Sequence, residues 1–182
     1  MIRAMIGTVA VLAGFAVVES SVDASTGLAG SCKATQAYAL LHPGEQLPIR
    51  ALPTPDGKVV GALATQNMTV DLATSVVTVV GSQSGWARIA LGGKDYTAID
   101  GAPQKYGWIP ADLLTVDTRI DGPIKTFSRP GLLGVELGRI EGEDQKFRLL
   151  GCRGEWLQVI NSTRGNIWIY RWCAKEEGCR SS

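Results

Sequence analysis

The stretch VGSQSGWARI at residues 80–89 recurs about 70 residues later as LGCRGEWLQV at residues 150–159. Each copy has a glycine five residues before its tryptophan, and apolar and polar residues alternate after that tryptophan. A Trp-Ile pair follows each copy, in GWI at residues 107–109 and in NIWI at residues 166–169. Alternation with a period of two is typical of strands that bury one face. A repeat at this spacing indicates two small units of one kind.

The rest of the chain indicates an all-β protein. Short β-rich runs are separated by Gly, Pro and Asp turns, and no helical period is visible outside the N-terminal segment. We predict one unit at residues 46–119 and a second at 120–173, with the boundary near the Asp-Gly-Pro turn at 121–123. Residues 25–45, which begin small and polar, are predicted to be a linker, and residues 174–182 a cysteine-containing tail.

The N-terminus has the order of a cleaved secretory signal peptide at residues 1–24. A basic residue, Arg3, precedes an apolar run from Ala4 to Val18, and small residues follow at Val22 and Ala24. The run is shorter than the roughly 20 residues that a membrane-spanning helix needs. An uncleaved signal anchor is the alternative. We expect a periplasmic or secreted protein with no membrane span after signal cleavage.

The four cysteines predict a disulfide framework, because an even count in an exported chain usually forms bridges. We expect at least one disulfide within Cys152, Cys173 and Cys179. Cys32 follows Leu-Ala-Gly-Ser, a sequence that resembles a bacterial lipobox, so lipid anchoring at Cys32 is an alternative to a disulfide role. No metal site is predicted, because the one histidine, His42, lies far along the chain from three of the four cysteines.

Several short phrases occur in the order found in one known family. They are PTP at 53–55, VGAL at 60–63, GWARI at 85–89 and GWIPADLL at 107–114. Over residues 46–117 and 122–173 the chain thus resembles the bacterial SH3-like (SH3b) domain family, in two tandem copies. The second copy departs from the pattern, with Asn166-Ile167 in place of the glycine before the closing Trp.

The resemblance implies a small, five-stranded, partly open β-barrel for each unit. It also implies a module that binds cell-wall peptides or other short peptides. A fold does not by itself identify a ligand.

Aromatic side chains are the best candidates for ligand contact, because they offer rigid area with a polar edge. Two of them lie in a longer segment before the last strand of the first unit, and others belong to the closing strands. The candidate ligand-binding residues are Tyr96, Tyr106, Trp108, Trp168, Tyr170 and Arg171. The mid-strand Trp86 and Trp156 are assigned to core or half-buried packing. Arginines in the second unit could meet an acidic ligand, although solvated strand and turn positions are the preferred explanation for them.

Composition and motifs argue against several other functions. Basic and acidic residues nearly balance, at 18 and 17, and no long basic run suggests nucleic-acid binding. No Cys-His pair, Gly-x-Ser-x-Gly phrase or phosphate loop is present, and no cofactor is expected. We expect an exported, non-catalytic protein that binds a cell-envelope ligand (peptidoglycan peptide) or a short peptide. The alternative is a protein-interaction or inhibitory module acting on a secreted or periplasmic protein partner.

Overall fold

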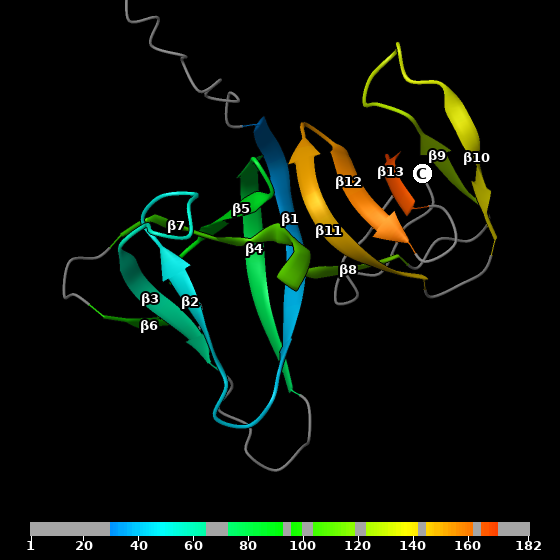
Figure 1. Cartoon of the computed structure of the whole chain (residues 1–182). Helices are drawn as coiled ribbons and strands as arrows, with labels where there is room; N and C mark the ends of the chain where they lie inside the picture. Colours follow the sequence, from blue (N-terminus) through cyan, green and yellow to red (C-terminus); the bar gives the residue numbers. More distant parts are fainter. Residues whose placement is uncertain are drawn as a thin grey trace, which may run out of the picture.

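The computed structural model describes residues 30–64, 73–92, 96–99, 104–118, 123–141, 145–161 and 165–170. These residues form thirteen strands and one short 3₁₀ turn, with no α-helix among them, which confirms the all-β prediction (Figure 1). The predicted signal peptide and the cysteine-containing tail lie outside the described residues, as do Arg171, Cys173 and Cys179.

The strands fall into two successive sets, which we call the first unit and the second unit. The first unit contains β1 (Gly30–Leu41), β2 (Gln46–Arg50), β3 (Val59–Ala64), β4 (Ala73–Gln83), β5 (Trp86–Ala90), β6 (Tyr96–Ala98), β7 (Tyr106–Pro110) and the turn η1 (Ala111–Leu113). The second unit contains β8 (Thr115–Thr118), β9 (Ile124–Phe127), β10 (Glu136–Ile140), β11 (Gln145–Arg153), β12 (Trp156–Asn161) and β13 (Gly165–Ile169).

Both units pair their strands in the same order. The first runs β1-β4-β5-β7-β2-β3 and the second runs β8-β11-β12-β13-β9-β10, with every neighbouring pair antiparallel. The first unit adds β6, which pairs with β3. The repeat seen in the sequence is therefore also a repeat of strand topology.

The register repeats as well. In the β4–β5 hairpin the pairing shifts between Val79 and Gly81, and in the β11–β12 hairpin it shifts between Leu149 and Gly151. Both shifts leave one extra residue on the longer strand, as in a β-bulge, which bends the strand and increases its twist. The glycine that precedes each tryptophan by five residues thus stands at the bend.

The predicted linker is wrong over Gly30–Leu41, because these residues form the long strand β1. Along β1, Thr35, Ala37, Ala39 and Leu41 are buried and alternate with more exposed residues. The sequence pattern does not reveal this strand, because three of these four inward residues are small or polar. In the same way β8 lies before the predicted boundary near residue 120, yet it pairs with β11 of the second unit.

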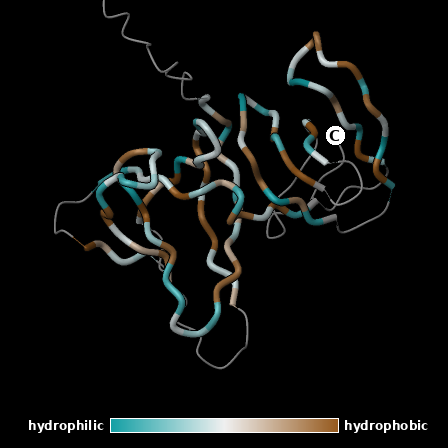
Figure 2. Tube along the Cα trace, viewed as in Figure 1, coloured by the Kyte–Doolittle hydropathy of each residue, from teal (hydrophilic) through white to brown (hydrophobic). Residues whose placement is uncertain are grey.

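The inward residues of both units join in one hydrophobic core, and Figure 2 shows apolar and polar residues alternating along the strands. Ala87 and Ile89 of β5 and Ile109 of β7 are fully buried, and Leu157, Val159 and Ile169 occupy the corresponding places in the second unit. The opposite faces of these strands remain partly open to solvent. The candidate site lies on those faces.

The units meet along equivalent strands. β1 pairs with β8 at Tyr38 and Thr115, and the Tyr38 hydroxyl donates a 2.6 Å hydrogen bond to Asp117. Ser82 of β4 faces its counterpart Cys152 of β11. Its hydroxyl donates to the Cys152 carbonyl at 3.1 Å and accepts from the Cys152 amide at 2.8 Å.

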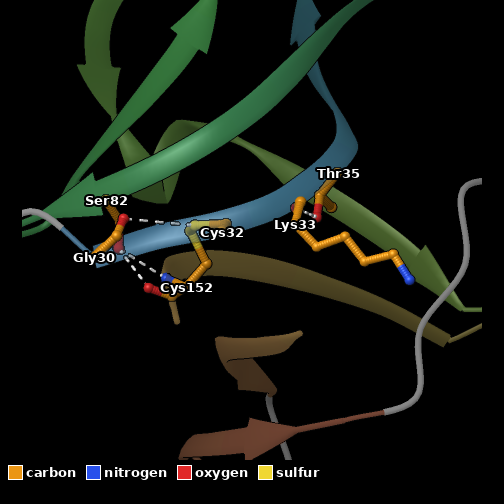
Figure 3. Close-up of a disulfide and its surroundings, with 6 residues drawn as sticks. All are labelled: Gly30, Cys32, Lys33, Thr35, Ser82 and Cys152. Atoms are coloured by element: carbon orange, nitrogen blue, oxygen red, sulfur yellow. Dashed lines mark hydrogen bonds between the residues drawn. A yellow bond between two sulfur atoms is a disulfide. The ribbon is translucent and has the colours of Figure 1, made fainter. Parts of the chain in front are cut away.

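A disulfide between Cys32 and Cys152 closes this junction, with their Cα atoms 5.7 Å apart (Figure 3). The sheet brings Cys152 a partner from 120 residues away, so a disulfide within Cys152, Cys173 and Cys179 is left only the pair Cys173 and Cys179, which lies outside the described residues. A bridge between Cys173 and Cys179 stays a prediction. Lipid anchoring at Cys32 is also excluded in this state, because a sulfur bound in a disulfide has no thiol left to acylate or alkylate.

Candidate functional site

Strands β5, β7 and β2 place five half-buried side chains on the outer surface of the first unit. Because Ala87, Ile89 and Ile109 point into the core, their neighbours in the strands must point outward. Trp108 pairs with Arg88 on one side and with Arg50 on the other. We call this surface the first aromatic face: Arg50, Trp86, Arg88, Tyr106 and Trp108.

The first aromatic face is cationic. The Arg88 guanidinium carbon lies 4.2 Å from the centre of the Tyr106 ring, and Lys105 Nζ lies 5.4 Å from it. Arg50 donates a 2.8 Å hydrogen bond to the Gly57 carbonyl, which orients its side chain beside Trp108. Within the described residues, no carboxylate forms a salt bridge with any of these three cations.

The second unit carries an equivalent surface on β12, β13 and β9. Trp156 packs against Phe127 edge to face, with ring centroids 5.1 Å apart, and against Tyr170 with centroids 5.0 Å apart. Trp168 pairs with Gln158 on one side and with Phe127 on the other. We call this surface the second aromatic face: Phe127, Trp156, Gln158, Trp168 and Tyr170.

A polar chain connects the second aromatic face to the junction between the units. The Tyr170 hydroxyl donates to Glu155 Oε2 at 2.9 Å, and Lys33 Nζ lies 3.1 Å from Glu155 Oε1. These two hydrogen bonds lower the pKa of Glu155, with the larger effect from Tyr170, and the Glu155 carboxylate raises the pKa of Tyr170. Lys33 follows Cys32 in the chain, so the Cys32–Cys152 disulfide helps to position Lys33 and, through it, Glu155 and Tyr170.

The predicted ligand-binding residues fall into two groups, one on each unit. Tyr106 and Trp108 lie together on the first aromatic face, and Trp168 and Tyr170 lie on the second. Arg171 lies outside the described residues.

Tyr96 belongs to neither face. It packs beside the core on β6, where a side chain at Gly61 would overlap its ring. It lines a pocket of about 80 Å³ with Leu63, Ile89 and other apolar residues. Ligand pockets usually measure roughly 300–1,000 Å³, so this one is too small for a peptide.

Sequence reasoning did not select the residues that complete the faces. Trp86 and Trp156 were expected in core or half-buried positions, and both are half-buried. They lie on the outer surfaces among the other aromatic residues. Arg88 gives a sequence signal that Trp86 faces outward. It lies two positions after Trp86, so both side chains are on the same face of the strand, opposite Ala87 and Ile89, and a charged residue is expected on the solvent side. Phe127 and Arg50 gave no such signal, since their pairing partners are distant in sequence.

No group of three or more His, Cys, Asp and Glu side chains among the described residues could hold a metal ion. No helix in this part of the chain is both long and apolar enough to span a membrane.

Comparison with known proteins does not assign a family. No protein-family model matches the chain, and no curated protein matches it. A solved structure of NlpC2 from Trichomonas vaginalis aligns with 75% of this chain and 46% of its own, at 18% sequence identity and a TM-score of 0.27. The chain thus spans less than half the length of that protein. A TM-score this low is no evidence of a shared fold or activity.

Proposed function

We propose that this chain is an exported, non-catalytic binding protein with two SH3-like units. Its ligand is a cell-envelope polymer bearing short peptides, such as peptidoglycan, or another short peptide. The observation that carries the proposal is the recurrence of a partly open aromatic surface at equivalent strands of both units. Two copies of one surface favour a repetitive ligand. Once one surface is bound to a polymer, the other meets the same polymer at a high effective concentration, so two weak contacts together give tighter binding.

The build of the two faces supports a binding role. All of their aromatic side chains except Tyr170 stand on sheet strands whose other face is core, so little side-chain freedom is lost on binding. The Cys32–Cys152 disulfide fits an oxidising compartment such as the periplasm or the cell exterior.

The test is retention of the full, processed chain on purified sacculi. We expect the wild-type protein to sediment with sacculi, and Trp108→Ala and Trp168→Ala each to weaken retention. The combined variant should weaken it more than either single change. Thr74→Ala is the matched control, because Thr74 is exposed on β4, outside both faces. Near-ultraviolet circular dichroism would verify folding. Absence of wild-type sedimentation at low salt would contradict the proposal.

A second candidate function, binding to a secreted or periplasmic protein, is favoured by the β9–β10 hairpin. Its loop leaves Leu132 fully exposed and Leu133 and Val135 largely exposed, and Leu137 at the start of β10 is also exposed. The loop is ordered by hydrogen bonds, including Arg129 Nε to the Leu133 carbonyl at 2.7 Å and the Ser128 amide to the Val135 carbonyl at 3.0 Å. Clustered exposed aliphatic residues often mark protein contacts.

Affinity capture from periplasmic extract separates the two functions. If a protein partner is the ligand, wild-type bait retains one stoichiometric protein, and Leu132→Ser combined with Leu133→Ser loses it. If the envelope polymer is the ligand, this double variant sediments with sacculi as well as the wild type does, while retention of Trp108→Ala is weakened.

A further inference from the structure

The two aromatic faces differ in charge at equivalent positions. The strand registers align Arg50 with Phe127 and Arg88 with Gln158, since each pair stands opposite the closing tryptophan of its unit. Lys105, just before β7, corresponds to Gly165, the first residue of β13 in the shorter hairpin. The two arginines of the first face and the adjacent Lys105 are thus replaced by uncharged residues in the second unit.

Arg88 is held in a geometry suited to an anion. Its guanidinium lies over the Tyr106 ring, and such stacking uses the flat face of the group. The N–H donors lie in the plane of the guanidinium, so they stay available at its edge for a two-pronged contact with a carboxylate. In the described structure Arg88 makes no hydrogen bond or salt bridge that would occupy them.

The neighbouring cations make an anion favourable. Arg88 and Lys105 both lie over the same ring, and Arg50 stands across Trp108 from Arg88. Like charges this close repel one another, and a bound anion would turn that repulsion into attraction. Arg50 has already given one N–H to the Gly57 carbonyl, which leaves Arg88 as the main donor.

We propose that the first aromatic face binds a peptide carboxylate, with Arg88 as the contacting group and Tyr106 as its support, while the second face binds an uncharged part of the ligand. The proposal rests on the proposed function, because it assigns the ligand chemistry of the same surface. On this proposal the two faces bind different parts of one ligand and are not two equal sites.

The experiment uses two matched peptides with the full processed chain. The probes are acetyl-Ala-Glu-Ala with a free C-terminus, and acetyl-Ala-Gln-Ala amide, which has nearly the same shape without charge. Binding is followed by NMR at the indole N–H signals, assigned by single Trp→Phe variants. We expect the acidic peptide to bind about tenfold more tightly at low salt, through the Trp108 signal, and the preference to shrink at high salt. Arg88→Gln should abolish the preference.

Two further variants keep the result from reflecting folding alone. Arg88→Lys keeps the positive charge but loses the planar guanidinium that can contact a carboxylate through two N–H groups, so it should retain part of the preference for the acidic peptide. Gln158→Arg copies the cation onto the second face, and it should make the Trp168 signal respond to the acidic peptide.

An acidic glycan without peptide, oligogalacturonate, should bind less tightly than the acidic peptide. Tighter binding of this glycan would overturn the assignment to a peptide.

The outcomes separate the two proposals. Sedimentation with sacculi together with equal affinity for both peptides, or an unchanged preference in Arg88→Gln, overturns the carboxylate site and leaves the proposed function standing. A charge preference at Trp108 without sedimentation overturns the envelope ligand and supports the carboxylate site. Absence of both overturns both.

Discussion

Tyr38 and Asp117 show how single residues join the two units. They come from the equivalent strands β1 and β8, and their side chains form a 2.6 Å hydrogen bond next to the β1–β8 pair. Asp117 is only 8% exposed, so losing its donor would leave a buried carboxylate without this partner. Burial, followed by the hydrogen bond and the negative charge of Asp117, raises the pKa of Tyr38 well above its ordinary value of 10.0.

Tyr38→Phe should lower the free energy of unfolding by about 1.5–3 kcal/mol at neutral pH, as for the loss of a hydrogen bond to a charged group. The raised pKa also predicts alkaline destabilisation in the wild type. Above pH 10 the phenol of the unfolded chain ionises while that of the folded chain stays protonated, so the unfolded state is favoured as pH rises.

Urea unfolding at pH 8 and pH 10.5 measures both effects. The wild type should lose more stability between these two values than Tyr38→Phe does, and Tyr106→Phe on the first aromatic face is the control. An equal loss in the wild type and in Tyr38→Phe would refute the link between the hydrogen bond and pH.

Glu155 provides a second prediction at this scale. Its pKa lies below the ordinary 4.5 because Tyr170 and Lys33 both bond to its ionised form. We expect an NMR titration of its side-chain carboxyl to give a midpoint below 4.5. Tyr170→Phe should move the midpoint upward more than Lys33→Gln does, because Tyr170 is the larger cause. A midpoint unmoved by Tyr170→Phe would mean that the bond does not form in solution.

At the scale of elements, the packing of β2 against β7 explains a difference between the repeats. Gly107 of β7 lies against Ile49 of β2, and a Cβ at Gly107 would overlap the Ile49 Cγ2. In the second unit the strand registers put Thr126 in the place of Ile49 and Ile167 in the place of Gly107. The larger residue thus sits on opposite strands in the two units. The smaller Thr126 in the place of Ile49 is consistent with a side chain at position 167, where the first unit has a glycine.

Gly107→Ala should therefore destabilise the protein by about 1–3 kcal/mol through overpacking. In an Ile49→Ala background the same change should cost much less, because the clashing methyl group is gone. Urea unfolding of the two single variants and the double variant gives the coupling energy. Additive effects would show that the cost of Gly107→Ala has a different origin.

At the scale of the whole molecule, the Cys32–Cys152 disulfide ties the first strand of the first unit to the second unit. It acts with a short parallel bridge, in which the Lys33 amide donates to the Gly154 carbonyl and the Gly154 amide to the Ser31 carbonyl, both at 2.8 Å. The closed loop spans 120 residues, so the crosslink restricts most of the described chain when it unfolds.

Removing this disulfide should lower the free energy of unfolding by about 2–4 kcal/mol. Reductant should shift the urea midpoint of the wild type by more than it shifts that of the Cys32→Ser, Cys152→Ser double variant, which has only Cys173 and Cys179 left to reduce. A wild-type midpoint that does not respond to reductant would contradict a stabilising role. Alkylation without reductant should leave Cys32 and Cys152 unmodified, which checks the pairing independently of Cys173 and Cys179.

The parts of the fold that follow local patterns could be predicted from the sequence. The alternation around Trp86 and Trp156 located the β4–β5 and β11–β12 hairpins, and Trp108 and Trp168 were correctly placed in the closing strands. Strand β1 was missed because Thr35, Ala37 and Ala39 are too small to mark a buried face. The candidate site was found in part, since Tyr106, Trp108, Trp168 and Tyr170 lie on the two faces while Tyr96 packs beside the core.

The sequence by itself determined that the chain is all β and built of two similar units, because strand periodicity, turns and a repeated phrase are properties of neighbouring residues. Only the tertiary structure decided that Cys32 bonds to Cys152, that Arg50 and Arg88 flank Trp108, and that Phe127 and Tyr170 pack against Trp156. These arrangements depend on which strands pair, and strand pairing brings together residues whose separation along the chain carries no local signal.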